Sequence, residues 1–306
     1  MATVSAPPAS SAAPIGRLRT YASFVRFEHT LFSLPLILAG VFSARGPALA
    51  PLRWMWIALA AVGARTAAMV LNRLIDRRLD ALNPRTRTRE LPAGRMRVIE
   101  GWALLGGNAL LYVVACAALG PWFLRVAAIP LAVFTLYPYL KRWTPLCHIG
   151  VGTALALAPL AGFAAAHPDL AHSAAAWWLA AFALCWVSGF DIIYATLDED
   201  FDRLHRLRSM VVWLGRDGAL RVAAALHFVA FLCLACATGA LLLLSPLLPD
   251  WAFPAVIAGL TVTGVLLYLE QRWADDVHLA FFKVNVVVGF AVLATVLIAR
   301  AAGRFR

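Results

Sequence analysis

The stretch that decides the fold is Asn72–Gly94, NRLIDRRLDALNPRTRTRELPAG. It closes a long apolar run with Asn72, Asp76 and Asp80, which are spaced four residues apart. On an α-helix each step of four residues turns about 400°, so the three side chains lie on one stripe. Oxygen ligands arranged in this way suit Mg²⁺. A basic loop follows at once, so the stretch predicts a divalent cation beside arginines, a combination that fits a diphosphate carried by an apolar molecule.

The same spacing of acidic side chains occurs again in the stretch GFDIIYATLDEDFDR at residues 189–203. Asp198 and Asp202 are four residues apart, and Asp191 precedes Asp198 by seven residues. If one helix continues through this stretch, the three carboxylates share one face, because seven residues make about two turns. Asp76 and Asp198 are 122 residues apart, and so are the second carboxylates of the two motifs. Two matching motifs at the ends of apolar runs are a stronger signal than one.

Composition predicts a membrane protein. Of the 306 residues, 62% are hydrophobic and only 14% are charged, so a soluble all-helical domain would expose too much apolar surface. The apolar runs reach the length of about 20 residues that a transmembrane helix needs. The net charge of +11 comes mostly from arginines in loops, and we do not expect a nucleic-acid partner. The five cysteines all lie in apolar stretches and suggest no disulfide framework.

We therefore expect an all-α polytopic membrane protein with about nine transmembrane helices around a central cavity. Residues 1–16 are rich in Ala, Ser and Pro and are predicted to be a disordered tail, with a cleaved targeting peptide as the alternative. Residues 17–306 are predicted to form a single transmembrane domain. The expected spans are residues 23–44, 53–75, 98–118, 122–140, 146–166, 174–197, 219–244, 251–270 and 278–300.

Basic residues predict the orientation of these spans. The loops after the second, fourth and sixth spans carry Lys and Arg, whereas the connections at 167–173 and 245–250 carry none. By the positive-inside rule the amino terminus and the basic loops face the cytoplasm, at the inner cell membrane. Both acidic motifs then lie on the cytoplasmic side, four spans apart. This spacing predicts two similar four-helix halves plus a ninth helix. The arginines from Arg300 onward run against the rule.

Charge balance suggests two Mg²⁺ ions. Asp76, Asp80, Asp198 and Asp202 carry four negative charges, which two such ions neutralise, and a diphosphate adds about three more. Metal ions in this position stabilise and orient a leaving group as its charge develops. The added negative charge needs basic side chains. The candidates for a diphosphate clamp are Lys141, Arg142, Arg89 and Arg208.

A structural role is the alternative at each of these positions. The acidic motifs could be solvated helix ends that pair with their own arginines. Arg65 in the second span, and Glu28 and His29 beside Arg26 in the first, could be internal pairs, although charges within a span are functional candidates by default. His148 is more often a structural residue than a catalytic one.

These motifs resemble the signatures of the UbiA superfamily of intramembrane aromatic prenyltransferases, over about residues 20–300. The matching elements are Asn72-x-x-x-Asp76-x-x-x-Asp80 with RELPAG at 89–94, Asp198-x-x-x-Asp202, and YPYLK at 137–141. Within the superfamily, NPRT at 83–86, Glu28-His29 and LCH at 146–148 look most like the 4-hydroxybenzoate polyprenyltransferase-like branch. That branch includes enzymes of the futalosine route to menaquinone. The chain departs from many members at Phe201, where an Asp is common, and at Arg208, where a Lys is common.

The resemblance implies Mg²⁺-dependent transfer of a polyprenyl group from polyprenyl diphosphate to an aromatic hydroxy acid in quinone biosynthesis. The implied metal ligands are Asn72, Asp76, Asp80, Asp198 and Asp202, and the implied diphosphate ligands are Tyr137, Lys141, Arg142, Arg89 and Arg208. Asp191 is the expected catalytic residue, which takes up a proton from the acceptor hydroxyl or orients it. Arg26 or Arg65 is expected to bind the acceptor carboxylate, and Tyr194 also belongs to the expected acceptor site.

Two alternatives remain open at this point, and a third is disfavoured. The acceptor could be 4-hydroxybenzoate or, by the futalosine route, 1,4-dihydroxy-6-naphthoate. A transporter of anionic metabolites would also use intramembrane charges and repeats, but it does not need two acidic pairs at one membrane face. A CDP-alcohol phosphatidyltransferase lacks support because the Gly and Arg pattern expected between its aspartates is absent.

Overall fold

The computed structural model describes residues 14–25, 30–168, 171–244, 248–274 and 283–302. These residues form helices and turns without strands, which confirms the predicted all-α class. Within these ranges, eight helical segments are long and apolar enough to cross a membrane, and a shorter apolar helix spans Ser33–Ser43. The protein is therefore a multi-pass membrane protein, and the number of candidate spans is close to the predicted nine.

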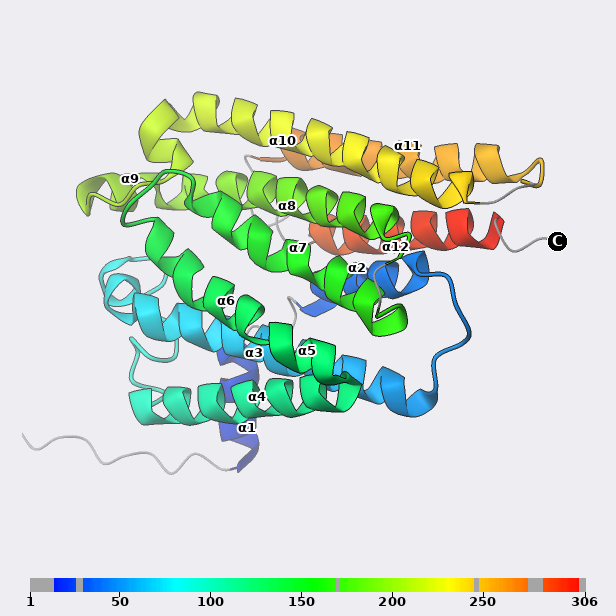
Figure 1. The fold of residues 1–306 in the computed structure, drawn as a ribbon. Coiled ribbons are helices and arrows are strands. Elements are labelled where there is room, and N and C mark those ends of the chain that lie inside the picture. Colours follow the sequence, from blue (N-terminus) through cyan, green and yellow to red (C-terminus); the bar gives the residue numbers. More distant parts are fainter. Residues whose placement is uncertain (1–13, 26–29, 169–170, 245–247, 275–282, 303–306) are drawn as a thin grey trace, which may run out of the picture.

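The helices follow the predicted order along the chain (Figure 1). The first part contains α1 (Pro14–Phe24), α2 (Thr30–Ser43), α3 (Pro51–Leu82), α4 (Val98–Leu119), α5 (Pro121–Val126) and α6 (Ala128–Leu140). The second part contains α7 (Cys147–Ala166), α8 (Ala174–Ala195), α9 (Glu199–Leu204), α10 (Met210–Leu243), α11 (Ala252–Arg272) and α12 (Asn285–Ala302). The likeness of the two four-helix halves stays a prediction.

The first acidic motif lies on an unusually long helix. α3 has 32 residues and begins with Pro51 at its first helical position, where the missing N–H costs no hydrogen bond. Its length of about 48 Å exceeds the hydrocarbon core of about 30 Å, so one end extends beyond the span. The helix ends at Leu82 because Asn83, which precedes a proline, is held in an extended conformation. Asp76 and Asp80 therefore lie on the last turns of a rigid element.

The second acidic motif is not on one continuous helix, and this corrects the sequence-based assumption. α8 ends at Ala195, a 3₁₀ turn covers Thr196–Asp198, and the short helix α9 carries Asp202. The span that begins with α8 is nevertheless the most buried of those described, since 72% of the residues in its apolar stretch are buried. It packs against α7 and α10 through Leu179, Phe182 and Trp186.

Two predicted boundaries also differ. The expected first span at 23–44 is divided in the described residues between α1 and α2, and Arg26, Glu28 and His29 lie outside the described residues. Helix α1 begins at Pro14, inside the predicted tail, whereas residues 1–13 lie outside the described residues.

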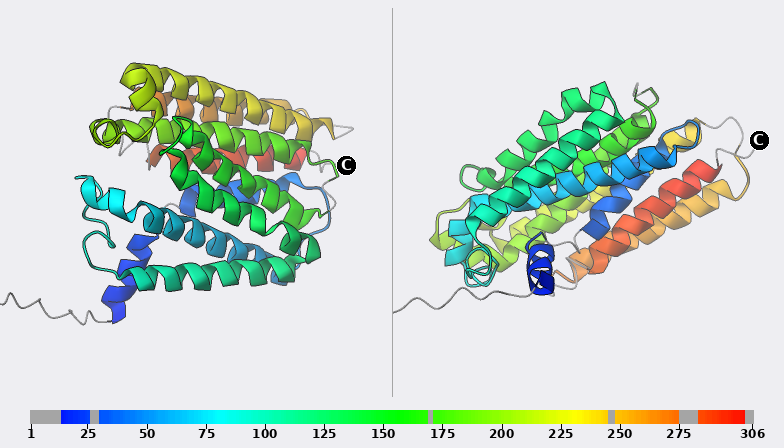
Figure 2. Two further views of the ribbon diagram at one scale, coloured as in Figure 1. Left: turned by 60° about the vertical axis from the view of Figure 1, so that its left-hand side comes forward. Right: turned by 90° about the horizontal axis from the view of Figure 1, so that it is seen from below.

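The helices run side by side, and α1 lies across the direction of the others (Figures 1 and 2). The C-terminal end of α3 and the short helix α9 are at the same end of the bundle (Figure 1). Both acidic motifs therefore come together at one end, from segments that are more than a hundred residues apart in sequence.

Candidate functional site

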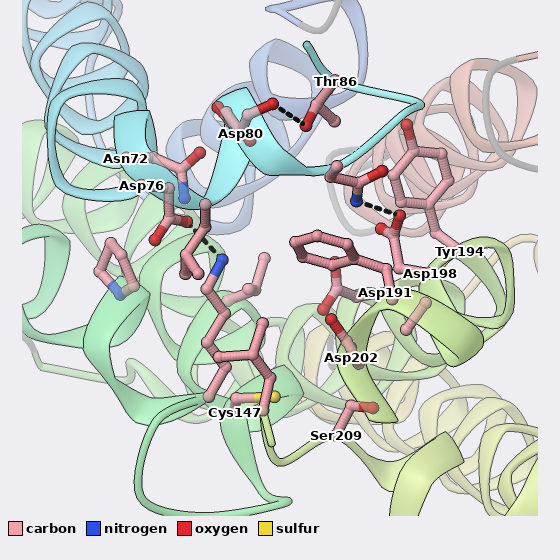
Figure 3. A pocket seen from close by; sticks show the side chains of 18 of the residues that line it. Asn72, Asp76, Asp80, Thr86, Cys147, Asp191, Tyr194, Asp198, Asp202 and Ser209 are labelled. Carbon is pink, nitrogen blue, oxygen red and sulfur yellow. Dashed lines mark hydrogen bonds and ion pairs between the residues drawn. The ribbon is translucent and has the colours of Figure 1, made fainter. Parts of the chain in front are cut away.

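A cavity of about 210 Å³ lies between the two acidic motifs. Its walls come from the end of α3, the loop after it, the ends of α6 and α8, the start of α7, and the segment around α9. Of the residues predicted from sequence, it brings together Asn72, Asp76, Asp80, Arg89, Tyr137, Lys141, Asp191, Tyr194, Asp198 and Asp202. Figure 3 shows Asn72, Asp76 and Asp80 on the α3 side, with Asp191, Asp198 and Asp202 on the other.

The carboxylates of the first motif are held by basic side chains. Lys141 Nζ lies 2.6 Å from Asp76 Oδ2, and Arg89 Nη1 lies 2.7 Å from Asp80 Oδ1. Asp76 and Asp80 are 4% and 7% exposed, so their charges require such partners. The loop after α3 folds back onto the helix end through Thr86 Oγ1, which donates to the Asp80 carbonyl at 3.0 Å. This turn brings Arg89 to the stripe that the sequence predicted.

Arg85 holds the second motif. Its Nε donates to Asp198 Oδ1 at 2.9 Å, its Nη2 pairs with Asp198 Oδ2, and its Nη1 donates to the Tyr194 hydroxyl at 2.6 Å. Asn83 Nδ2 also donates to Asp198 Oδ1 at 2.8 Å. Burial lowers the pKa of the Arg85 guanidinium, but its hydrogen bonds to Asp198 and Tyr194 outweigh burial and raise that pKa above its ordinary value. The loop after α3 is thereby joined to both sides of the cavity.

Asp191 has a different kind of partner. Its Oδ2 lies 2.6 Å from His148 Nδ1, and its side chain is 27% exposed, while that of His148 is 4% exposed. Ser209, at the start of α10, and Cys147 complete this part of the cavity wall. Asp191 is therefore open to the cavity on one side and fixed by a histidine on the other.

Three of the predicted residues that the structure describes do not line the cavity. Arg142 Nη2 lies 3.5 Å from Asp76 Oδ1 and donates to the Ile75 carbonyl at 3.2 Å. Arg208 donates through Nη1 to the Trp143 carbonyl at 2.7 Å, and its backbone N–H donates to the Lys141 carbonyl at 2.6 Å. Arg208 thus joins two loops, and its role as a diphosphate ligand stays a prediction. Arg26 lies outside the described residues.

Arg65, the third of the described residues that do not line the cavity, lies deeper in the protein. It precedes Asn72 by seven residues on α3, which places it on the same face of the helix and about 10 Å further from the motif. Its buried Nε has no hydrogen-bond partner among the described residues, and its charge interacts with Tyr137, which lines the cavity. Arg65 therefore places a positive charge in the part of the protein that lies beneath the cavity.

Sequence reasoning did not single out Arg85, Asn83 or His148 as site residues. Arg85 was one of many arginines in the same loop, and only its place in the NPRT segment distinguished it. His148 was interpreted as structural because a lone histidine at an apolar helix start carries no spacing signal. The contacts across the cavity depend on the path of the loop after α3. The spacing of residues in the sequence does not predict that path.

The donor set fits Mg²⁺ that is completed by a ligand. Among the described residues, no three His, Cys, Asp or Glu side chains are close enough to hold an ion by themselves. Mg²⁺ is usually bound by one or two carboxylates together with waters and phosphate oxygens, so an incomplete set of this kind is what it requires. Asn72, Asp76 and Asp80 could serve one such ion, and Asp198 and Asp202 another. The cations Lys141, Arg85 and Arg89 lie within reach of an anion in the same cavity.

Comparison with known protein families relates most of this chain to one of them. A sequence model described as the UbiA prenyltransferase family matches residues 33–287. A protein of Cupriavidus necator named 4-hydroxybenzoate octaprenyltransferase is 31% identical over 253 residues, which cover 79% of this chain and 84% of that protein. One of the same name from Shewanella amazonensis is 29% identical over 171 residues, and the match spans 54% of this chain and 58% of that relative's length.

Solved structures show the same architecture. The apo structure of a UbiA homolog from Aeropyrum pernix K1 aligns with a TM-score of 0.78 and 31% identity, over 89% of this chain and 98% of that one. A UbiA homolog from Archaeoglobus fulgidus, whose structure contains DMAPP and Mg²⁺, aligns with a TM-score of 0.65 and 18% identity, over 90% of this chain and 99% of that one. At that identity the second match supports the fold alone.

Proposed function

This chain belongs to the UbiA prenyltransferase family, and from that membership we propose that it transfers a polyprenyl group from polyprenyl diphosphate to 4-hydroxybenzoate. The observation that carries the proposal is the cavity in which both acidic motifs and three basic side chains, Lys141, Arg85 and Arg89, meet. The relatives named 4-hydroxybenzoate octaprenyltransferase support this acceptor and make an octaprenyl donor the first one to test. The family membership leaves the transporter alternative without support.

The diphosphate is proposed to lie between the two motifs. Asn72, Asp76, Asp80, Asp198 and Asp202 would hold two Mg²⁺ ions, a number that balances the four carboxylate charges. Bound there, Mg²⁺ supplies charge neutralisation for the leaving diphosphate. Lys141, Arg85 and Arg89 would then exchange some of their contacts with the carboxylates for contacts with the diphosphate oxygens. Basic side chains placed in advance stabilise the charge that develops as the carbon–oxygen bond breaks.

The acceptor is proposed to bind on the deeper side of the diphosphate. Asp191 faces the cavity and would accept the proton of the acceptor hydroxyl, which makes the neighbouring ring carbon more nucleophilic. Tyr194 lies beside it, and Arg65, beneath Tyr137, would pair with the acceptor carboxylate. Arg26 is the other candidate for that pair. The buried walls would keep water away from the allylic cation, which otherwise hydrolyses.

Product formation tests the proposal. Membranes that contain the protein are given Mg²⁺, octaprenyl diphosphate and labelled 4-hydroxybenzoate, and the lipid-soluble label is measured. We expect product with the wild type, a loss of at least about a hundredfold in Asp76→Ala and Asp198→Ala, and no product in excess EDTA. Asp200→Ala is the matched control, because Asp200 is an exposed carboxylate of the same segment that does not line the cavity.

Two results would contradict the proposal. Full activity in either motif variant, or activity that persists in EDTA, would remove the metal mechanism. A wild type that labels 1,4-dihydroxy-6-naphthoate and ignores 4-hydroxybenzoate would keep the chemistry and change the acceptor. The resemblance of NPRT and LCH to a branch that includes futalosine-route enzymes is the reason to include this second acceptor.

A further inference from the structure

His148 sits behind Asp191 in a fully formed hydrogen-bond arrangement. It lies on the first turn of α7, is buried, and contacts two other elements. Its Nδ1 is 2.6 Å from Asp191 Oδ2 on α8, and its Nε2 accepts from the Met210 backbone N–H at 3.3 Å on α10. Ser188 Oγ donates to the His148 carbonyl at 3.2 Å and fixes the backbone as well. The imidazole therefore has a single orientation.

These contacts determine where the imidazole proton lies. The Met210 backbone nitrogen can only donate, so His148 Nε2 must present its lone pair. The neutral ring then carries its proton on Nδ1, which points at Asp191 Oδ2. A ring protonated on both nitrogens would set an N–H against the Met210 N–H. His148 is thus fixed as a donor to one oxygen of Asp191.

We propose that His148 is a positioning residue for the prenyl transfer, which holds Asp191 so that its second oxygen faces the acceptor hydroxyl. This inference rests on the proposed function. Among the described residues, Asp191 Oδ1 has no hydrogen bond, and the residue lines the cavity. A carboxylate with one oxygen held and the other directed at the substrate is oriented like the acid–base groups of many enzymes.

The step balances as follows. The acceptor hydroxyl gives its proton to Asp191 Oδ1. The carbon–oxygen bond of the prenyl diphosphate breaks with its electron pair on the diphosphate, and a bond forms between the allylic carbon and the ring carbon beside the oxygen. That ring carbon then loses its proton to the diphosphate, and the ring oxygen regains a proton from Asp191. The products are the prenylated phenol and protonated diphosphate, and His148 is unchanged throughout.

A purely structural role for His148 would give different results, because it pins α7 to α8 and α10. Loss of packing would lower thermal stability, diphosphate affinity and turnover together. Loss of positioning would lower acceptor transfer, while the binding of Mg²⁺ and prenyl diphosphate, which involves other side chains, would stay the same. The two roles therefore separate in measurements made on the same purified protein.

Three substitutions at His148 provide the test. His148→Asn keeps an amide N–H near the position of Nδ1, His148→Gln places its amide near the position of Nε2, and His148→Ala keeps neither. We expect His148→Ala to lower kcat for the acceptor by about tenfold or more, with His148→Asn clearly more active than His148→Gln. The affinity for a non-cleavable prenyl thiodiphosphate with Mg²⁺ should be that of the wild type in all folded variants.

A more acidic acceptor gives a measurement that a change in packing alone does not affect. Fluorine beside the hydroxyl, as in 3-fluoro-4-hydroxybenzoate, lowers the pKa of the phenol, so proton transfer to Asp191 matters less. We expect the ratio of wild-type to His148→Asn or His148→Gln activity to shrink with the fluorinated acceptor. Equal ratios for both acceptors, or His148→Gln as active as His148→Asn, would overturn the proposal. If His148→Ala does not fold, the comparison of Asn with Gln decides. A wild type without any product would instead contradict the proposed function.

Discussion

At the scale of the residue, three carboxylates of the cavity each contact a basic side chain. Asp76 contacts Lys141, Asp80 contacts Arg89, and Asp198 contacts Arg85. Buried carboxylates without such partners would cost several kcal/mol each, so the cations are needed for the site to exist at all. The same cations are available to a diphosphate. The basic side chains that balance the buried carboxylates are therefore the ones that would receive the substrate.

Arg85 gives the sharpest prediction at this scale. Its guanidinium bridges Asp198 and the Tyr194 hydroxyl, a forked contact that a lysine cannot reproduce. We expect Arg85→Ala to lower kcat/KM for the prenyl diphosphate by about tenfold or more and Arg85→Lys to recover only part of the loss. Steady-state assays over a range of donor concentrations measure the effect.

The control for this prediction is Arg87→Ala. Arg87 lies two residues away, is exposed, and does not line the cavity. Its removal should leave kcat/KM within about twofold of the wild type, because exposed charges of this kind contribute little. Equal losses in the Arg85 and Arg87 variants would mean that the loop acts only through its net charge.

The sequence predicted some of these contacts and not others, for a physical reason. Asn72, Asp76 and Asp80 share a stripe because helical geometry alone places them there. Arg85 could not be chosen over its neighbours, because the loop after α3 has no period and its path depends on Thr86 and Asn83. Arg208 was chosen for its charge, but its guanidinium joins a carbonyl in the neighbouring loop.

At the scale of the element, the helices around the cavity are placed by close backbone contacts. A Cβ on Gly162 of α7 would lie 2.2 Å from the Ile37 carbonyl oxygen of α2, and a Cβ on Gly40 would lie 2.0 Å from the Pro159 carbonyl oxygen. These atoms belong to the backbone and cannot turn aside. Small residues are therefore what allow α2 and α7 to approach each other, as in many membrane helix pairs.

Gly162→Ala tests this contact. The added methyl must separate α7 from α2, which we expect to destabilise the protein by about 1–3 kcal/mol and lower its Tm in detergent. Gly107→Ala is the matched control, because nothing lies within 4 Å of a Cβ at Gly107 on α4. There alanine should leave the Tm unchanged or raise it, since alanine favours a helix by about 1 kcal/mol over glycine. Equal effects of the two substitutions would contradict the packing account.

The arginine that ran against the positive-inside rule has a local explanation. Arg300, on the last turn of α12, donates through Nη1 to the Phe42 carbonyl at 2.6 Å and to the Ala44 carbonyl, at the C-terminal end of α2. A cation at a helix C-terminus satisfies carbonyls that have no partner within the helix. Arg300 thus serves α2 rather than the orientation of the chain. Arg304 and Arg306 lie outside the described residues.

The break in the helix after α8 is a feature that the sequence did not predict. The spacing would place Asp191, Asp198 and Asp202 on one face if a single helix continued through them, yet a 3₁₀ turn interrupts the helix at Thr196–Asp198. All three carboxylates still line the cavity, because the turn redirects α9 without moving it away. Spacing therefore predicted which residues meet, but not the backbone that brings them together.

At the scale of the whole molecule, length, composition and the two motifs were sufficient to predict a helical membrane protein with its acidic ends at one face. Both α3 and α8 run toward the same end of the bundle, which is the parity that the loop charges predicted (Figure 1). The first predicted span is divided between α1 and α2 in the described residues, and the polar residues Arg26, Glu28 and His29 fall between the two helices in the sequence.

The orientation of the molecule gives a prediction at this scale. Thr88 lies in the basic loop beside the cavity and Asp250 precedes α11 at the other end, and both are exposed. In a Cys236→Ala background, Thr88→Cys should resist a membrane-impermeant maleimide in intact cells and react in inverted vesicles, with the reverse result for Asp250→Cys. Mass shift on a gel measures the labelling. Thr88→Cys that reacts in intact cells would place the cavity on the outer side.

The central claim is that the two acidic motifs form one Mg²⁺-dependent diphosphate site, and equilibrium binding of a non-cleavable prenyl thiodiphosphate to the purified protein tests it most directly. We predict binding only with Mg²⁺, a loss of about tenfold or more in both Asp76→Asn and Asp198→Asn, and wild-type binding in Asp200→Asn. Wild-type affinity in either motif variant, or equal affinity with Mg²⁺ and with EDTA, would contradict the account.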